Sequence, residues 1–201
     1  MQLGLFVPEA PGPLVLSRGA TGEIAYFAGA LNGAASARLF TKLRDAAEWA
    51  SERRPMYDRV VDVPRLTARL DLGAVEADPD LRAMRERVES LTGARFNSIS
   101  LNLYRDERDS VAWHNDRENE LVANPVIALV SLGATREMRI RSKSLPRRTL
   151  RLTLERGSLL VMSGACQHYW EHHVPKERRA TGPRISVAFR QRPPEREAPA
   201  P

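Results

Sequence analysis

The chain has 201 residues, of which 42% are hydrophobic and 28% are charged, with a formal net charge of +6 and a pI of about 10.1. The single cysteine, Cys166, excludes an intrachain disulfide, and no run approaches the roughly 18 apolar residues of a membrane helix. The basic balance favours nucleic acid as a partner first and an anionic membrane second. Because the N-terminus also lacks the basic start of a signal peptide, we expect a cytoplasmic protein that does not enter a membrane. We also expect a monomer.

The first third of the chain predicts few regular elements. Residues 1–33 are rich in Gly and Pro and predict short strands and turns. Residues 34–50 predict a helix, because apolar side chains recur near helical spacing. Residues 53–76 predict a loop-rich segment, since Pro55 and Pro64 flank a short apolar run.

The clearest predicted helix follows this segment. Asp78 is a suitable N-cap, Pro79 is suited to the first turn, and Gly93 is a typical stop. The residues between them also place apolar side chains on one face, namely Leu81, Met84, Val88 and Leu91.

After Gly93 the sequence changes to short runs rich in β-branched residues, separated by turn residues. Two helices followed by many short strands predict an α+β fold whose functional body is a β-sandwich or barrel. The proline-rich tail from residue 193 to 201 predicts disorder. The predicted strands are Ser98–Tyr104, Val126–Leu132, Glu137–Arg141, Thr149–Leu154, Ser158–Met162 and Ile185–Arg190.

The run Trp113-His114-Asn115-Asp116 carries candidate metal ligands. His114 and Asp116 are two residues apart on an extended segment, so their side chains point the same way. Two histidines and one carboxylate form the facial triad of non-haem Fe(II) oxygenases, whereas one cysteine cannot supply a structural zinc site. The alternative is a surface histidine beside a solvated aspartate. Three of the four histidines lie further on, and at most one of them should be the third ligand: His168, His172 and His173.

A second pattern stands near the end of the chain. Arg184 and Arg190 are six residues apart on a predicted strand and therefore share a face. Guanidinium groups pair with carboxylates in a bidentate fork, so such a face can hold a dicarboxylate. The alternative is a pair of edge-strand arginines that keep the sheet from aggregating.

Taken together and in order, these motifs resemble the AlkB family of Fe(II)- and 2-oxoglutarate-dependent dioxygenases, and most strongly its nucleic-acid-repair branch. The likeness covers roughly residues 95–192. It rests on Asn102-Leu103-Tyr104-Arg105-Asp106, Trp113-His114-Asn115-Asp116, Ser131-Leu132-Gly133-Ala134-Thr135-Arg136, Gly157–Gly164, Gln167, Trp170, His172, Val174-Pro175-Lys176, Pro183-Arg184 and Phe189-Arg190.

The resemblance implies a fold, a set of cofactors and a set of roles. The implied fold is a double-stranded β-helix, a jelly roll, over residues 95–192, with N-terminal helices packed on it. Residues 1–94 are the implied extension that includes a substrate lid. The implied cofactors are Fe(II), 2-oxoglutarate as cosubstrate and O2. The implied iron ligands are His114, Asp116 and His172, and the implied 2-oxoglutarate contacts are Asn102, Tyr104, Arg184 and Arg190.

The implied activity is oxidative demethylation of N-alkylated bases, of the 1-methyladenine and 3-methylcytosine type, in DNA or RNA. A buried iron requires a base that leaves the stack, and cations along the phosphate path. We expect Glu118, Trp113 and Arg136 on the substrate side. A basic span follows, which is either a phosphate path or a solvated hairpin: Arg136, Arg139, Arg141, Lys143, Arg147, Arg148, Arg151 and Arg156.

The sequence departs from the family pattern on the substrate side. The stretch Pro64–Asp71 lacks the aromatic residues with which relatives stack the base, and Met56 and Tyr57 are the nearest candidates. Ser186 stands where some relatives carry Asn. These departures keep two alternatives open: the same chemistry on a tRNA, a protein or a small molecule, and a non-catalytic nucleic-acid-binding module.

Overall fold

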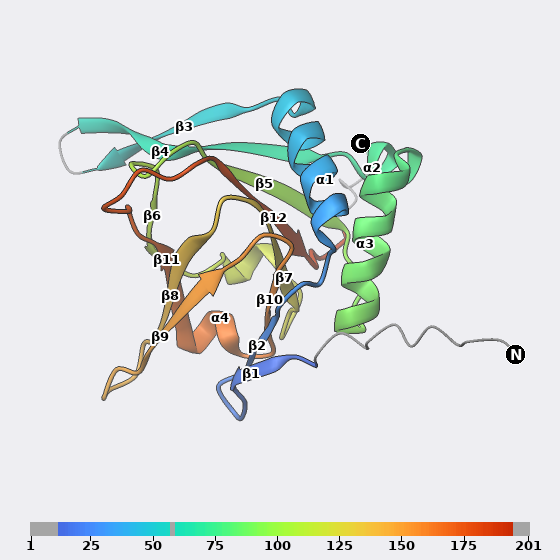
Figure 1. The fold of residues 1–201 in the computed structure, drawn as a ribbon. Coiled ribbons are helices and arrows are strands. Elements are labelled where there is room, and N and C mark those ends of the chain that lie inside the picture. The colour runs from blue at the N-terminus through green and yellow to red at the C-terminus, as the bar shows by residue number, and fades with distance from the viewer. Residues whose placement is uncertain (1–11, 57–58, 195–201) are drawn as a thin grey trace, which may run out of the picture.

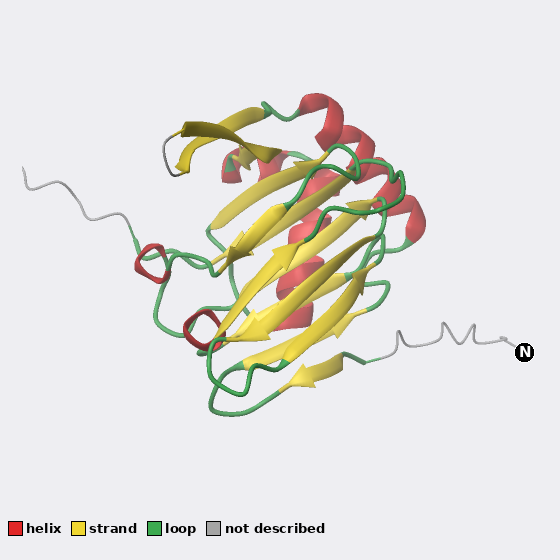
Figure 2. Ribbon diagram, turned by 90° about the vertical axis from the view of Figure 1, so that its left-hand side faces the viewer, coloured by secondary structure: helices red, strands yellow, loops and turns green. Residues whose placement is uncertain are grey.

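Two antiparallel sheets face each other in the structure, a computed structural model that describes residues 12–56 and 59–194 (Figures 1 and 2). The large sheet has eight strands in the order β1-β2-β10-β7-β12-β5-β4-β3, and the small sheet has four in the order β6-β11-β8-β9. This arrangement confirms the predicted α+β class with a jelly-roll core and packed helices. No helix in the described ranges is long and apolar enough to span a membrane.

The elements have the following bounds. The strands are β1 Leu14–Ser17, β2 Glu23–Phe27, β3 Ala50–Met56, β4 Arg59–Leu70, β5 Ser98–Tyr104, β6 Val111–His114, β7 Ile127–Gly133, β8 Arg136–Ser142, β9 Thr149–Leu154, β10 Leu159–Ser163, β11 Trp170–Val174 and β12 Arg184–Arg190. The helices are α1 Gly33–Ala46, α2 Leu72–Ala77, α3 Pro79–Thr92, α4 Cys166–Tyr169 and the 3-10 turn η1 Glu118–Glu120.

The core has two layers because β7 is buried on both faces. Side chains alternate along a strand, so Val130 and Leu132 pack toward the helices and Ile127 and Leu129 pack toward the small sheet. Helices α1 and α3 cover the outer face of the large sheet (Figure 1). One layer of the core thus lies between the helices and the large sheet, and the other lies between the two sheets.

Helix α3 begins and ends as the sequence predicts. The Asp78 side chain accepts hydrogen bonds from the N–H groups of Asp80 and Leu81, and Pro79 occupies the first turn. Gly93 ends the helix in the left-handed region with φ of 66°. The predicted helix over residues 34–50 is shorter, because α1 ends at Ala46 and β3 begins at Ala50.

The prediction of a loop over residues 53–76 is wrong. This segment forms most of the β3–β4 hairpin and helix α2. Strand β3 is the edge of the large sheet, where Pro55 is tolerated. The β3–β4 pairing jumps from Leu66 to Asp62, so Pro64 lies in an irregular stretch that needs no ladder N–H. The predicted lid candidates, the Met56 side chain and Tyr57, and residues 195–201 of the predicted disordered tail lie outside what the structure describes.

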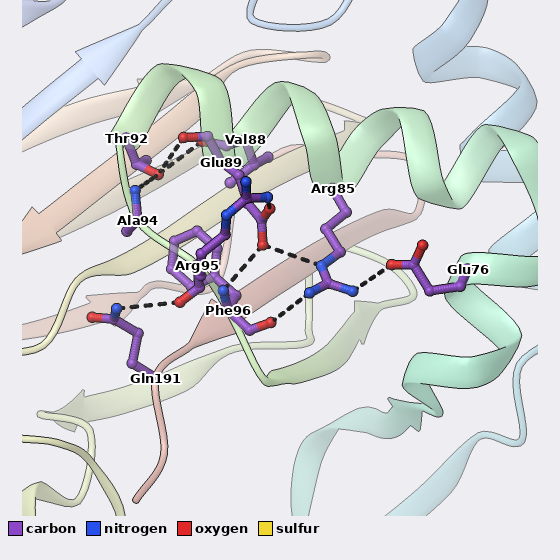
Figure 3. A network of polar contacts seen from close by, with 9 residues as sticks. All are labelled: Glu76, Arg85, Val88, Glu89, Thr92, Ala94, Arg95, Phe96 and Gln191. Atoms are coloured by element: carbon purple, nitrogen blue, oxygen red, sulfur yellow. Dashed lines mark hydrogen bonds and ion pairs between the residues drawn. The ribbon is translucent and has the colours of Figure 1, made fainter.

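A buried carboxylate joins α3 to the start of β5 (Figure 3). The Glu89 carboxylate accepts hydrogen bonds from the Phe96 N–H at 3.1 Å and from Arg85 Nε at 3.2 Å, and it also pairs with Arg95. Burial raises the pKa of Glu89, but these hydrogen bonds outweigh burial and hold the pKa below its ordinary value of 4.5. Glu89 thereby fixes the strand that carries Asn102 and Tyr104.

We expect Glu89→Gln to lower the free energy of unfolding by about 2 kcal/mol at neutral pH, because three donors lose a charged acceptor. The folded-state pKa is depressed, so this stability is present above the unfolded-state pKa and is lost as the pH falls through the folded-state pKa. Urea unfolding of both proteins at neutral and acidic pH should show the difference shrink in acid. Glu86→Gln, on the exposed face of the same helix, is the control. An equal loss in that control would contradict the prediction.

Candidate metal centre

Three side chains with metal-ligand chemistry converge between the sheets. His114 ends β6, Asp116 follows it in the next loop, and His172 lies on β11, and one ligand atom from each lies within 4.8 Å of the others. His114 and His172 are direct partners in the β6–β11 ladder, with ring centroids 4.3 Å apart. Because β6 ends at His114, strand alternation does not place Asp116, which must be held by other contacts.

Two contacts hold Asp116. Its backbone N–H donates to Oε1 of Gln167 at 2.8 Å, and its Oδ2 accepts from Nε of Arg190 at 2.6 Å. Burial raises the pKa of the carboxyl, but the positive charge and hydrogen bond of Arg190 outweigh it and lower the pKa overall. The group is therefore a carboxylate at neutral pH and can act as an anionic ligand.

Both histidines of the triad present a neutral imidazole. Nδ1 of His114 lies 2.8 Å from the carbonyl oxygen of Ala112, which can only accept, so Nδ1 carries the proton and Nε2 is free to coordinate. Burial, with a smaller contribution from His114, lowers the pKa of His172 to about 3. The other two candidates do not join the centre: His168 lies on the surface 3.7 Å from Glu118, and His173 points to the other side of the sheet.

The triad lines a cavity of about 600 Å³. This volume is in the range of ordinary small-molecule sites. Strands β4, β5 and β12 of the large sheet contribute many of the other polar groups of the lining, and Leu121, Leu129 and Met138 contribute apolar surface. The predicted cosubstrate residues on the lining are Asn102, Tyr104 and Arg190.

The large sheet places Arg184 beside Tyr104. Its strand, β12, lies between β7 and β5, so the alternative of edge-strand arginines is wrong. The Arg184 side chain is 0% exposed, its guanidinium carbon lies 5.4 Å from the Tyr104 ring centroid, and Nη2 donates to Ser131 Oγ at 2.9 Å. Its Nε and Nη1 are buried and have no hydrogen-bond partner among the described residues. Burial lowers the pKa of Arg184 to about 10, so it remains a cation at neutral pH. An anionic ligand would accept hydrogen bonds from these two nitrogens and balance the charge of the guanidinium.

The structure does not bring the three predicted substrate residues to the cavity. Trp113 stacks against His173 outside the small sheet. Arg136 is 1% exposed and donates to the backbone carbonyls of Asp106, Asp109 and Pro175, while Glu118 is exposed beside His168. None of the eight residues of the basic span is part of the cavity lining.

Sequence reasoning missed two residues of the centre. Arg65 on β4 lines the cavity, and its Nε and Nη1 are buried without a hydrogen-bond partner among the described residues. Burial is the main cause of the lowered pKa of both His114 and His172, and the charge of Arg65 contributes to both, so Arg65 lies near the triad. Gln167 belongs to the motif run, but its contact with Asp116 spans 51 positions and has no local sequence signal.

Comparison with known proteins assigns the chain to a family. The family model described as 2OG-Fe(II) oxygenase superfamily matches residues 72–190, a range that contains the whole triad. The chain is 35% identical over 216 residues to alpha-ketoglutarate-dependent dioxygenase alkB homolog 3 of Rattus norvegicus, covering 92% of the chain and 73% of the rat protein. The chain belongs to the AlkB family.

Other AlkB-family proteins match over a little more than half of the chain. Identity to alkB homolog 3 of Homo sapiens is 43% over 120 residues, or 56% of this chain and 42% of the human protein. Identity to DNA oxidative demethylase ALKBH2 of Mus musculus is 39% over 120 residues, or 56% of this chain and 50% of the mouse protein. These matches thus span half or less of each relative.

A solved structure of low sequence identity shares the fold of the chain. The epimerase SnoN from nogalamycin biosynthesis, described as non-heme and alpha-ketoglutarate-dependent, superposes with a TM-score of 0.60 at 14% identity, covering 90% of this chain and 89% of its own. At this identity the likeness concerns the fold alone. It agrees with the jelly-roll core.

Proposed function

We propose that this AlkB-family protein is an Fe(II)- and 2-oxoglutarate-dependent dioxygenase that demethylates N-alkylated bases, of the 1-methyladenine or 3-methylcytosine type, in DNA or RNA. The observation that carries the proposal is one cavity that joins the His114, Asp116 and His172 triad to Tyr104, which lies beside the buried Arg184. We further propose that it acts as a monomer in the cytoplasm, where the single buried Cys166 remains reduced.

The donor set of the triad fits Fe(II). Two neutral imidazoles and one carboxylate match the facial triad, and they leave further positions for a chelating cosubstrate and oxygen. The unpaired N–H groups of buried Arg184 fit one carboxylate of 2-oxoglutarate, and Asn102 and Tyr104 lie on the neighbouring strand to orient the rest. When bound, Fe(II) would activate O2, which is the oxidant: overall, one O2 would convert 2-oxoglutarate to succinate and CO2 and the N-methyl group to formaldehyde.

The chain's own residues hold the reacting groups in place. Gln167 and Arg190 fix the backbone and the carboxylate of Asp116, so its orientation does not depend on the strand that precedes it. The Ala112 carbonyl keeps the proton of His114 on Nδ1. Ser100 accepts a hydrogen bond from Arg190 Nη1 at 2.5 Å and limits the movement of that guanidinium.

Nucleic acid as the substrate is supported by charge and by the relatives. The net charge of +6 favours a polyanion, and one matched relative is named a DNA oxidative demethylase. A flipped base would reach the triad through the cavity, whose lining includes Arg65 and Arg69 of the β3–β4 hairpin. We propose this hairpin as the substrate lid.

A second candidate keeps the oxygenase chemistry and changes the substrate to a tRNA, a protein or a small molecule. The sequence of the proposed lid favours this second candidate, because Pro64–Asp71 offers no aromatic side chain for stacking a base. The cations of the cavity lining, Arg65 and Arg69, favour nucleic acid.

We expect turnover of oligonucleotides that carry 1-methyladenine or 3-methylcytosine, with one formaldehyde released for each succinate. The assay supplies Fe(II), 2-oxoglutarate and O2, and compares each methylated oligonucleotide with its unmethylated counterpart and with the free methylated nucleoside. A preference for the oligonucleotide that falls steeply with added salt would support phosphate contacts. Succinate that is independent of methylation would favour the second candidate.

A further inference from the structure

A stack of three side chains lies on the outer face of the small sheet. The Trp113 indole stacks on the His173 ring, with centroids 4.1 Å apart and an interplanar angle of 28°. The Arg141 guanidinium carbon lies 4.0 Å from the Trp113 ring centroid, and Arg141 Nε pairs with Glu171 Oε1 at 2.5 Å. Trp113 is thus in contact with residues of both β11 and β8.

This stack lies directly behind the metal ligands. Side chains alternate across a strand, so Trp113 points outward where His114 points inward. On β11, Glu171 and His173 point outward on either side of His172. Because His114 and His172 face each other in the ladder, the stack joins the same two strands from the other side of the sheet.

Strand β6 is short and lies at an edge. It has four residues at one edge of the small sheet, and within the described residues it forms a ladder with β11 alone, while Val111 packs against the core. That ladder is irregular between His172 and Val174. A short, irregular edge strand does not by itself fix the position of its side chains to the precision that a metal site requires.

We propose that Trp113 is a positioning residue, which sets the position of His114 relative to His172 through its stack with His173 and Arg141. The inference rests on the proposed function, because it concerns the same metal centre. Trp113 touches none of the reacting groups: it acts from the opposite face, as outer partners of metal ligands do. Gln167 holds the other end of the ligand segment from inside the fold.

The test is metal affinity without turnover. Mn(II) or Co(II) is titrated into the full-length protein by calorimetry, with neither 2-oxoglutarate nor oligonucleotide present. We expect Trp113→Ala to raise the metal Kd by about 10- to 100-fold and to alter the visible spectrum of bound Co(II). Trp113→Phe, which keeps an aromatic face, should restore most of the affinity.

Two controls separate positioning from general damage. Val88→Ala lowers stability from the core under α3, far from the metal centre, and should leave the metal Kd unchanged. Arg151→Ala removes an exposed cation from β9, on the same sheet, and should also bind as the wild type does. Equal weakening in Val88→Ala and Trp113→Ala would overturn the inference.

The remaining outcomes distinguish this inference from the proposed function. If the wild type binds metal and His172→Ala does not, but Trp113→Ala binds normally, the inference fails and the proposed function stands. A raised KM for the oligonucleotide with an unchanged metal Kd would also overturn it and would return Trp113 to the substrate side. A wild type that binds no metal would overturn the proposed function itself.

Discussion

Replacing His172 with alanine is expected to abolish metal binding and to reduce succinate formation by about 1000-fold or more, since ligand loss removes several kcal/mol of metal-ion catalysis. His172 is 6% exposed and faces His114 across the ladder, so no neighbouring histidine can take its place. His168 lies at the surface, and His173 stacks on Trp113 on the outer face. Calorimetric metal titration and a succinate assay measure the two effects.

His168→Ala is the matched control for this variant. It removes the same residue type four positions earlier, from the exposed surface of α4. Exposed substitutions change stability little, so metal affinity and turnover should stay within about twofold of the wild type. If His168→Ala lost the metal and His172→Ala retained it, the assignment of the third ligand would be wrong.

Replacing Arg184 with methionine is expected to raise the KM for 2-oxoglutarate by about 100-fold, the effect of removing one partner of a buried ion pair. Two of its nitrogens are buried without a partner among the described residues, and the side chain has no exposure to water. Methionine fills a similar volume without a charge, so the ligand-free protein should be as stable as the wild type or more stable. Lysine would not restore binding, because it lacks the planar fork of arginine.

Thermal unfolding with and without 2-oxoglutarate separates binding from folding in this variant. The wild type should gain a ligand-dependent rise in Tm that Arg184→Met lacks. Arg151→Met, an exposed arginine on β9, should keep the rise. A full 2-oxoglutarate shift in Arg184→Met would show that the cosubstrate binds elsewhere.

The sequence alone predicts the chemistry of the centre better than its surroundings. His114 and Asp116 are local neighbours, and the spacing of motifs around His172 identifies the third ligand through the family resemblance. The shared face of Arg184 and Arg190 follows from strand periodicity, and in the structure both residues lie on one strand, β12. The structure adds that Arg190 is engaged with Asp116 and Ser100, whereas Nε and Nη1 of Arg184 have no hydrogen-bond partner in the described part of the chain.

The positions of Arg136 and Trp113 differ from the predicted substrate side because they depend on contacts between distant parts of the chain and on the face of the strand. Arg136 belongs to a basic run and reads as a surface cation, but carbonyl groups from Asp106, Asp109 and Pro175 surround it. Trp113 is next to a ligand in the chain and, for that reason, on the opposite face of the strand. The β3–β4 hairpin was not predicted because its two prolines indicate a loop. Only the sheet topology shows that Pro55 lies on an edge strand and Pro64 in an irregular stretch of the pairing.

The most direct test of the account is the mass of a methylated oligonucleotide before and after reaction. A single strand carrying one 1-methyladenine is incubated with the wild-type protein and with Fe(II), 2-oxoglutarate and O2, and each of the three is omitted in turn. We predict that the oligonucleotide loses the mass of one methylene group only when all three are present. With His172→Ala its mass should not change. An unchanged mass while succinate forms, or a loss without 2-oxoglutarate, would contradict it.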